Sequence, residues 1–207
     1  AAASAAAKPP TFKGAEWIWH KGADKAAGTW CFQKGFAFPA GQKPKKARVL
    51  ITCDNLWTLH VNGKQVGRND SARNSWKRPQ SVDVTKHLVI EMNAIAIEGT
   101  NTIPGVAGLL VKLVVEFEDV KETFELVSDK TWISASKPTK GWKDNGFVAG
   151  LDWGPVTVIG AYGMSPWGKV RVRGGGGKAR RAPKPAVSLP LVTDKEELAK
   201  PIYADGV

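Results

Sequence analysis

The chain has 207 residues, of which 43% are hydrophobic, and it includes nine tryptophans. That composition excludes a globally disordered protein and suits one well-packed β domain with tails. No apolar run reaches the roughly 18 residues that a membrane-spanning helix needs, so we expect no transmembrane helix. The formal net charge is +11 at pH 7, which raises the question of an anionic partner.

We expect residues 1–14 to form a flexible leader. Residues 1–10 do not combine a charged segment with a long apolar one, so they do not predict an intact signal peptide. The remnant of a cleaved signal peptide and a flexible linker both fit this composition.

Alternating apolar and polar residues predict about ten short strands and almost no helix between residues 15 and 168. Asn62 and Gly63 supply the two positive-φ residues of a tight hairpin turn, and residues 85–88 suit a short turn. Closely spaced strands are typical of an all-β jelly-roll sandwich. The predicted strands cover residues 16–19, 29–38, 47–53, 57–61, 64–67, 80–84, 92–98, 108–117, 121–127, 131–134 and 155–159.

Basic residues gather near the C-terminus. Residues 168–187 hold seven basic and no acidic residues, so we expect 169–207 to be a Gly-rich basic linker and docking tail. An acidic polysaccharide, a cell-surface polymer or an acidic protein face would suit such a tail, and a solvated linker is the simpler interpretation. Residues 193–199 suit one or two helical turns. The basic stretch lacks aromatic residues, which argues against nucleic-acid binding.

Cys31 and Cys53 are the only cysteines, and both fall in predicted strands. Because no CxxC or mixed Cys/His cluster is present, the sequence argues against structural zinc or a covalently attached haem in this chain. Two buried small hydrophobic residues and one disulfide of an exported domain both remain open.

An ordered set of motifs gives the chain a family resemblance over roughly residues 15 to 168. It resembles the galactose-binding-like jelly-roll domains that accompany bacterial α-L-rhamnosidases, and similar modules in large secreted bacterial proteins, some of which carry c-type haem domains. In chain order, the motifs are Glu16-Trp-Ile-Trp19, Phe32-Gln-Lys-Gly-Phe36, Ile51-Thr-Cys-Asp-Asn55, His60-Val-Asn-Gly63, Val82-Asp-Val-Thr85, Asn93-Ala-Ile-Ala-Ile97, Gly108-Leu-Leu110, Ser128-Asp-Lys-Thr-Trp132 and Pro166-Trp-Gly168.

The resemblance implies the fold and export to the periplasm, the cell surface or the medium. It also implies that calcium could stiffen the domain, although no D-x-D-x-D run places such a site, so we predict no cofactor. Two departures from the family are His60, where an aromatic residue is usual, and the absence of a stretch that could supply the catalytic helical barrel.

The sequence does not predict an enzyme. Glycoside hydrolysis needs two facing carboxylates, and nothing in the spacing of the loop carboxylates pairs them. The three histidines are scattered, and no G-x-S-x-G or H-E-x-x-H motif is present. The carboxylates considered are Asp54, Asp70, Glu98, Asp144 and Asp152, and the histidines are His20, His60 and His87.

Sugar binding needs an apolar platform and planar polar groups, and loop residues supply both. Loops at one end of a jelly roll commonly form the ligand cleft, so we expect Asn101 and the 142–145 loop to share the end that holds the 68–76 loop. Trp76 suits either ligand contact or a lid packed on Pro79. The predicted binding residues are Arg68, Asn69, Asp70, Arg73, Trp76, Asn101 and Trp142.

Two functions follow from these observations. The first is a non-catalytic carbohydrate-binding or adhesion module of an exported protein, for a glycan or cell-envelope polysaccharide, with acidic glycans suiting the basic surface. The second is a structural or accessory subunit of a larger secreted hydrolase or haem protein, on which residues 169–207 would dock.

Overall fold

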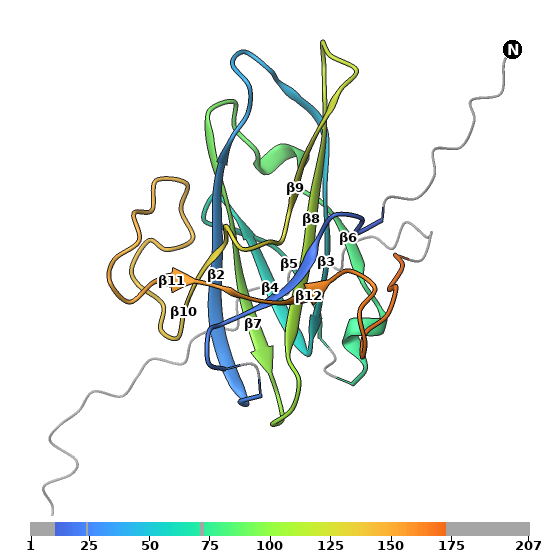
Figure 1. Cartoon of the computed structure of the whole chain (residues 1–207). Helices are drawn as coiled ribbons and strands as arrows, with labels where there is room; N and C mark the ends of the chain where they lie inside the picture. The colour runs from blue at the N-terminus through green and yellow to red at the C-terminus, as the bar shows by residue number, and fades with distance from the viewer. Residues whose placement is uncertain (1–10, 24, 71–72, 173–207) are drawn as a thin grey trace, which may run out of the picture.

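The computed structural model describes residues 11–23, 25–70 and 73–172, which form two layers of antiparallel strands (Figure 1). Most of the predicted leader and tail, including the possible helical turns at 193–199, lies outside the described residues. The strands are β1 (Glu16–Trp19), β2 (Gly28–Ala37), β3 (Pro44–Asp54), β4 (Leu56–Val61), β5 (Lys64–Arg68), β6 (Gln80–Asp83), β7 (Met92–Asn101), β8 (Gly108–Phe117), β9 (Thr123–Val127), β10 (Ile133–Ala135), β11 (Gly154–Pro155) and β12 (Thr157–Ala161).

Each layer is a six-stranded sheet, which confirms the predicted jelly-roll sandwich. One sheet has the order β12-β1-β8-β3-β6 with β9 also paired to β8, and the other has the order β11-β10-β2-β7-β4-β5. The long pairs β2–β7 and β3–β8 form the centre of each sheet. Asn62 (φ 48°) and Gly63 (φ 79°) make the predicted hairpin turn between β4 and β5.

The main core lies between the sheets because alternate residues of every long strand point inward. Its aromatic centre is Trp19, whose ring centroid lies 5.2 Å from that of Phe32 and 5.5 Å from that of Trp30. Cys53 belongs to this core, whereas Cys31 packs on the outer face of the second sheet. Both are buried free thiols, so the structure supports the small-hydrophobe interpretation and not the disulfide.

A second cluster covers the outer face of the sheet that contains β1, β3 and β8. Trp17 and Trp167 stack there, with ring centroids 4.2 Å apart. Phe12 and Val170 are buried in the same cluster. The packed structure therefore begins before residue 15 and extends beyond residue 168, because segments outside the predicted domain bounds contribute apolar side chains.

The last predicted strand, 155–159, is divided in the structure. β11 pairs with β10 in one sheet, and β12 pairs with β1 in the other. The chain crosses between the sheets at Val156, whose N–H donates to Trp132 O at 3.2 Å. One apolar run therefore serves both layers, which strand periodicity alone does not reveal.

The helical segments of the described residues are two 3₁₀ helices of three residues each. They are η1 (Ser75–Lys77) and η2 (Thr85–His87), the second of which confirms the predicted short turn. Neither is long or apolar enough to span a bilayer.

The contact between Gly108 and the stacked indoles gives a stability test. A Cβ on Gly108 would lie 2.8 Å from the Trp17 ring and 2.9 Å from the Trp167 ring, so Gly108→Ala should lower the free energy of unfolding by about 1–3 kcal/mol. Gly154→Ala is the matched control, because no atom lies within 4 Å of its added Cβ. Urea unfolding followed by tryptophan fluorescence measures both, and equal stabilities for the two variants would contradict the packing.

Candidate functional site

A network of hydrogen bonds, here called the polar corner, surrounds Asn55 where β3 ends and β4 begins. The Asn55 N–H donates to Thr100 O at 2.9 Å. Its side-chain Oδ1 accepts from the backbone N–H and the hydroxyl of Thr102, both at 2.8 Å. Its carbonyl accepts from Asn69 Nδ2 at 2.9 Å and from the Ser75 hydroxyl. Asn55 thus joins the end of β7 to the loop that follows β5.

Asn69 fixes the start of that loop. Its Oδ1 accepts from the Trp57 N–H at 2.6 Å, and its own N–H donates to Trp57 O at 3.1 Å. Further along, the Ser75 hydroxyl donates to Cys53 O at 2.9 Å and the Thr52 hydroxyl donates to Trp76 O at 3.0 Å. Both described ends of the loop are therefore held against β3 and β4.

Asp54 adds a half-buried carboxylate to the polar corner. Its Oδ2 accepts from Trp167 Nε1 at 3.0 Å, and its Oδ1 accepts from Asn55 Nδ2 at 2.7 Å. Burial raises the pKa of Asp54 above its usual value, and the hydrogen bond from Trp167 opposes this shift. Trp167, which packs in the second cluster, thus also orients the Asp54 side chain at the corner.

The structure brings Asn101 and the 68–76 loop to the same end of the sandwich. Asn101 is buried, and its Nδ2 donates to Ala26 O at 3.0 Å and to Gly105 O at 3.1 Å. Its amide therefore positions the 102–106 loop. The side chains of Arg68, Asp70 and Arg73 are exposed near this end. Their contact with a ligand stays a prediction.

Trp76 is half-buried in the way the lid interpretation describes. Its ring packs against the second cluster, Pro79 is buried nearby, and the Lys77 ammonium lies 4.9 Å from the ring centroid. Ligand contact through Trp76 stays a prediction. A sugar that packs on this ring would have to do so beside the Lys77 ammonium.

The expectation that the 142–145 loop shares this end was wrong. Trp142 is only 4% exposed and packs on the outer face of the second sheet, with its ring centroid 5.6 Å from that of Trp153. The Gly63 N–H donates to Lys143 O at 2.8 Å, which places the loop at the β4–β5 turn. The polar corner lies at the other end of β4. The 142–145 loop does not reach it, because residues 136–153 fold back over the outer face of the second sheet.

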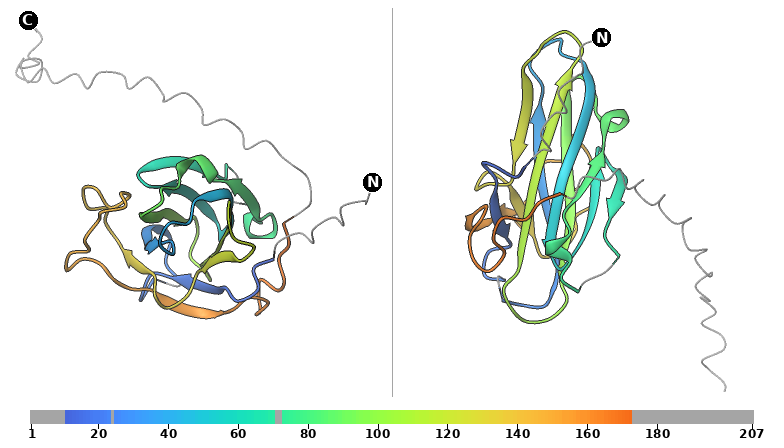
Figure 2. Two further views of the ribbon diagram at one scale, coloured as in Figure 1. Left: turned by 90° about the horizontal axis from the view of Figure 1, so that it is seen from above. Right: turned by 90° about the vertical axis from the view of Figure 1, so that its right-hand side faces the viewer.

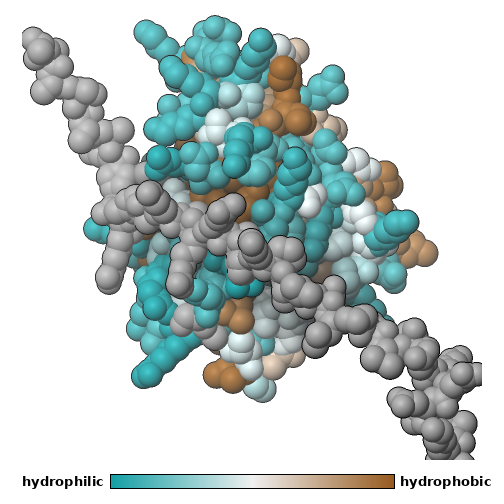
Figure 3. Space-filling model, turned by 180° about the vertical axis from the view of Figure 1, so that it is seen from behind, coloured by the Kyte–Doolittle hydropathy of each residue, from teal (hydrophilic) through white to brown (hydrophobic). Residues whose placement is uncertain are grey.

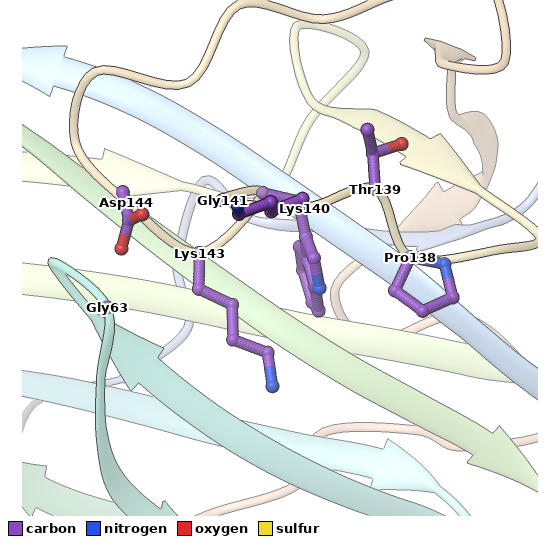
Figure 4. Close-up of a pocket in the computed structure, with 8 residues that line it drawn as sticks. Gly63, Pro138, Thr139, Lys140, Gly141, Lys143 and Asp144 are labelled. Carbon is purple, nitrogen blue, oxygen red and sulfur yellow. The ribbon is translucent and has the colours of Figure 1, made fainter.

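Figure 4 shows the hollow that this loop forms, with a volume of about 400 Å³. It is lined by Gly63 and residues 138–144, and the Lys143 side chain reaches from the loop across the strands. The Lys143 ammonium pairs with Glu98 at 2.8 Å, so this carboxylate has a cationic partner. Gln33 Nε2 donates to Trp142 O at 3.3 Å and holds the loop to the sheet.

Sequence reasoning missed two features of the polar corner. Asn55 was not predicted as a site residue, although its place directly after a predicted strand was the available signal. Ile103 and Val106 were not considered, yet their side chains are 66% and 47% exposed in the loop that Asn101 positions. The corner thus pairs aliphatic surface with amide and carboxylate groups.

The implied calcium finds no carboxylate site here. Among the described residues, no three His, Cys, Asp or Glu side chains lie together in a way that could hold a metal ion. Both oxygens of Asp54 already accept hydrogen bonds.

The bonds made by Asn69 give a test of the polar corner. Asn69→Ala would leave the Trp57 N–H and the Asn55 carbonyl without their amide partner, which should lower the free energy of unfolding by about 2–4 kcal/mol. Asn145→Ala, which removes one exposed bond to Met92 O, should cost less than about 1 kcal/mol. Chemical denaturation compares the two, and a small loss for Asn69→Ala would show that the loop is held elsewhere.

His60, beneath the 136–153 loop, gives a pH test. Burial and then the Lys143 ammonium lower its pKa from 6.5 to about 4, and its Nδ1 is buried without a hydrogen-bond partner. The unfolded chain therefore binds the proton first as the pH falls. The contribution of His60 to the free energy of unfolding is therefore complete above pH 6.5. It is lost as the pH falls towards 4, by at most roughly 1.4 kcal/mol per pH unit.

His60→Gln should flatten this pH dependence of the free energy of unfolding. His87→Gln is the control. The pKa of His87 is also lowered, first by burial, but its side chain is only partly buried, so this substitution should change the pH dependence less. Unfolding curves between pH 4 and pH 7 measure both variants, and an unchanged slope in His60→Gln would contradict the assignment.

Comparison with known proteins gives similar domains of two kinds, although no family model matches the chain. The α-L-rhamnosidase of Streptomyces avermitilis is 29% identical over 168 residues, which are 78% of this chain and 16% of that enzyme. Its crystal structure with L-rhamnose aligns with a TM-score of 0.72 at 29% identity, over 79% of this chain and 16% of that chain. The chain thus spans only a small part of this relative.

The second kind is a lectin from Pleurotus ostreatus in complex with GalNAc, with 26% identity and a TM-score of 0.68 over 79% of this chain and 48% of the lectin. The rhamnosidase of Bacillus sp. GL1, at 24% identity and a TM-score of 0.63 over 77% of this chain and 20% of that chain, supports the fold alone. Fold, motifs and similarities confirm the resemblance: the chain is similar to the galactose-binding-like jelly-roll domains that accompany α-L-rhamnosidases.

Proposed function

We propose that this domain is a non-catalytic carbohydrate-binding module, and that the polar corner binds the sugar. The observation that carries the proposal is the likeness to a lectin whose crystal structure is a complex with GalNAc, at 26% identity and a TM-score of 0.68. A rhamnosidase domain with the same fold, from a crystal that contains L-rhamnose, points to the same ligand class.

The chemistry of the corner suits a pyranose ring. A sugar presents a C–H face that packs on apolar surface and hydroxyl groups that need fixed polar partners. Ile103 and Val106 offer exposed aliphatic surface, and Asn101 and the Thr102–Asn55 bonds anchor the loop that carries them. We propose that hydroxyl groups bond to the exposed polar side chains beside this loop, namely Arg68, Asp70 and Arg73.

The surroundings of Asp54 and Glu98 support a binding role over hydrolysis. Hydrolysis requires an acid and a second carboxylate on either side of one bond. Asp54 is committed to Trp167 and Asn55, and Glu98 pairs with Lys143 on the outer face of the second sheet. We propose that any catalytic part belongs to a larger, exported glycoside hydrolase in which this domain is one module.

A structural or accessory role is the second candidate. Val148 and Leu151 project almost fully exposed from the 136–153 loop, which suits contact with another part of a larger hydrolase. The haem-protein partner considered from the sequence stays a prediction, as does docking through residues 173–207, which lie outside the described part of the chain.

A paired substitution tests the sugar site. Calorimetric titration of the 207-residue chain with L-rhamnose, GalNAc and galactose should show weak binding to at least one sugar. The double variant Ile103→Ser/Val106→Ser should weaken that binding about tenfold, because the aliphatic platform is lost.

The matched control is Val148→Ser/Leu151→Ser, which removes two still more exposed aliphatic groups from the 136–153 loop and should leave sugar affinity unchanged. Thermal melts confirm that both variants are folded. Binding that is insensitive to the first pair would move the site elsewhere, and no binding across a broad glycan array would overturn the function. Loss of a co-purifying partner in the control variant would favour the accessory role.

A further inference from the structure

One lateral side of the sandwich is bounded by β5 and β6, which are the terminal strands of the two sheets. Residues 69–70 and 73–79, the described parts of the loop between these two strands, lie at the end of the sandwich that holds the polar corner. Figure 2 shows these teal and green segments together on the side away from the orange β12. The same side, seen from behind in Figure 3, is mostly hydrophilic where it is not covered by grey atoms.

Exposed basic side chains run along this side. Residues 64–86 contain six basic and two acidic residues. Lys64 and Arg68 stand at the two ends of β5, about 14 Å apart along the strand. We name as the basic edge the exposed residues Lys64, Arg68, Arg73, Lys77 and Lys86.

Asp83, one of the two acidic residues, is already compensated. Its Oδ1 accepts from the Thr85 N–H at 3.0 Å and from the Thr85 hydroxyl at 2.7 Å, and its backbone pairs with Arg48 on β3. The Thr85 N–H lowers the pKa of Asp83 most, with smaller contributions from Arg48 and Lys46. This carboxylate therefore stays ionised, and its negative charge offsets one of the six basic charges of residues 64–86.

The far end of the edge has a positive field. His87 follows Lys86 and lies near Lys64, and Asn62 Nδ2 donates to the His87 carbonyl at 2.9 Å, which ties this end to the β4–β5 turn. Burial lowers the pKa of His87 most, and Lys86 and Lys64 lower it further while Asp83 opposes them. Cations from both sheets thus act on one position.

The near end is held rigidly beside the polar corner. Asn69 and Ser75 bond to the Asn55 carbonyl, and the Arg78 guanidinium donates to Arg73 O at 2.8 Å. A row of cations that starts beside the proposed sugar site and continues along a strand suits an extended polyanion better than a small anion. Trp76 is half-buried under Lys77, so the described residues of this side offer no open aromatic face for stacking of nucleic-acid bases.

We infer that the basic edge binds an anionic glycan, a polysaccharide carrying uronate or sulfate groups, whose sugar residue occupies the polar corner. This inference rests on the proposed function and names its ligand class. The uronate and sulfate groups would be contacted in register along β5 and the loop, while the neutral part of the repeat lies on the aliphatic platform.

The test compares two triple variants of the full chain. Lys64→Gln/Lys77→Gln/Lys86→Gln removes three cations of the edge that are not assigned to the sugar site, and Lys121→Gln/Lys130→Gln/Lys137→Gln removes three exposed lysines from segments near β9 and β10. Both variants keep the basic stretch 168–187, so its contribution is the same in each. The probes are fluorescent polygalacturonate, chondroitin sulfate, a neutral galactan of equal length and a DNA oligonucleotide of equal charge.

We expect the chain to bind an anionic glycan more tightly than the neutral galactan. The edge variant should weaken binding about tenfold and reduce its dependence on salt between about 50 and 200 mM, while the control variant changes it less than about twofold. Equal losses in the two triple variants would show unspecific attraction and overturn the inference. So would edge-dependent binding of the DNA as tight as that of the glycans.

The two proposals fail in distinguishable ways. Tight binding of the neutral galactan or of a free sugar that neither triple variant changes would overturn the anionic-glycan inference and leave the carbohydrate-binding function intact. Absence of binding to every glycan, charged or neutral, would overturn both.

Discussion

The polar corner depends on Asn55, whose backbone and side chain satisfy groups from three separate segments. Its N–H and Oδ1 hold residues 100–102, and its carbonyl holds Asn69 and Ser75. A buried backbone group without a partner costs as much as a lost hydrogen bond, so these loops have few alternative positions. The exposed groups that we assign to ligand binding lie on loops that the hydrogen bonds of Asn55 hold in place.

The sandwich decides which loops can meet. Inner-face packing around Trp19 fixes the distance between the sheets, and the second cluster around Trp17 and Trp167 seals the outer face of one of them. Trp167 also bonds to Asp54, so packing and polar geometry are coupled at the corner. The terminal strands β5 and β6 lie at one side of the sandwich. Their outer edges face water, which favours polar and charged side chains there.

Much of the fold could be predicted because strand periodicity is local. The alternation through Trp57, Leu59 and Val61 and the Asn62-Gly63 turn needed only neighbouring residues, and each appears in the structure. The site was predicted less well. Asn69 and Asn101 reach the same end as expected, but as residues that hold loops, while Trp142 lies on a sheet face because the path of a long connection depends on distant partners.

The sequence by itself determined the two-layer β architecture, the hairpin turn and the family resemblance, because all of these follow from local pattern and order. Only the tertiary structure decided that both cysteines are free, that residues 155–159 divide between the sheets, and that Asn55 unites the corner. It also decided that the cations of β5 and of the 69–79 loop line one side. These facts depend on which strands become neighbours, and neighbours distant in sequence are chosen by the packing of the whole domain.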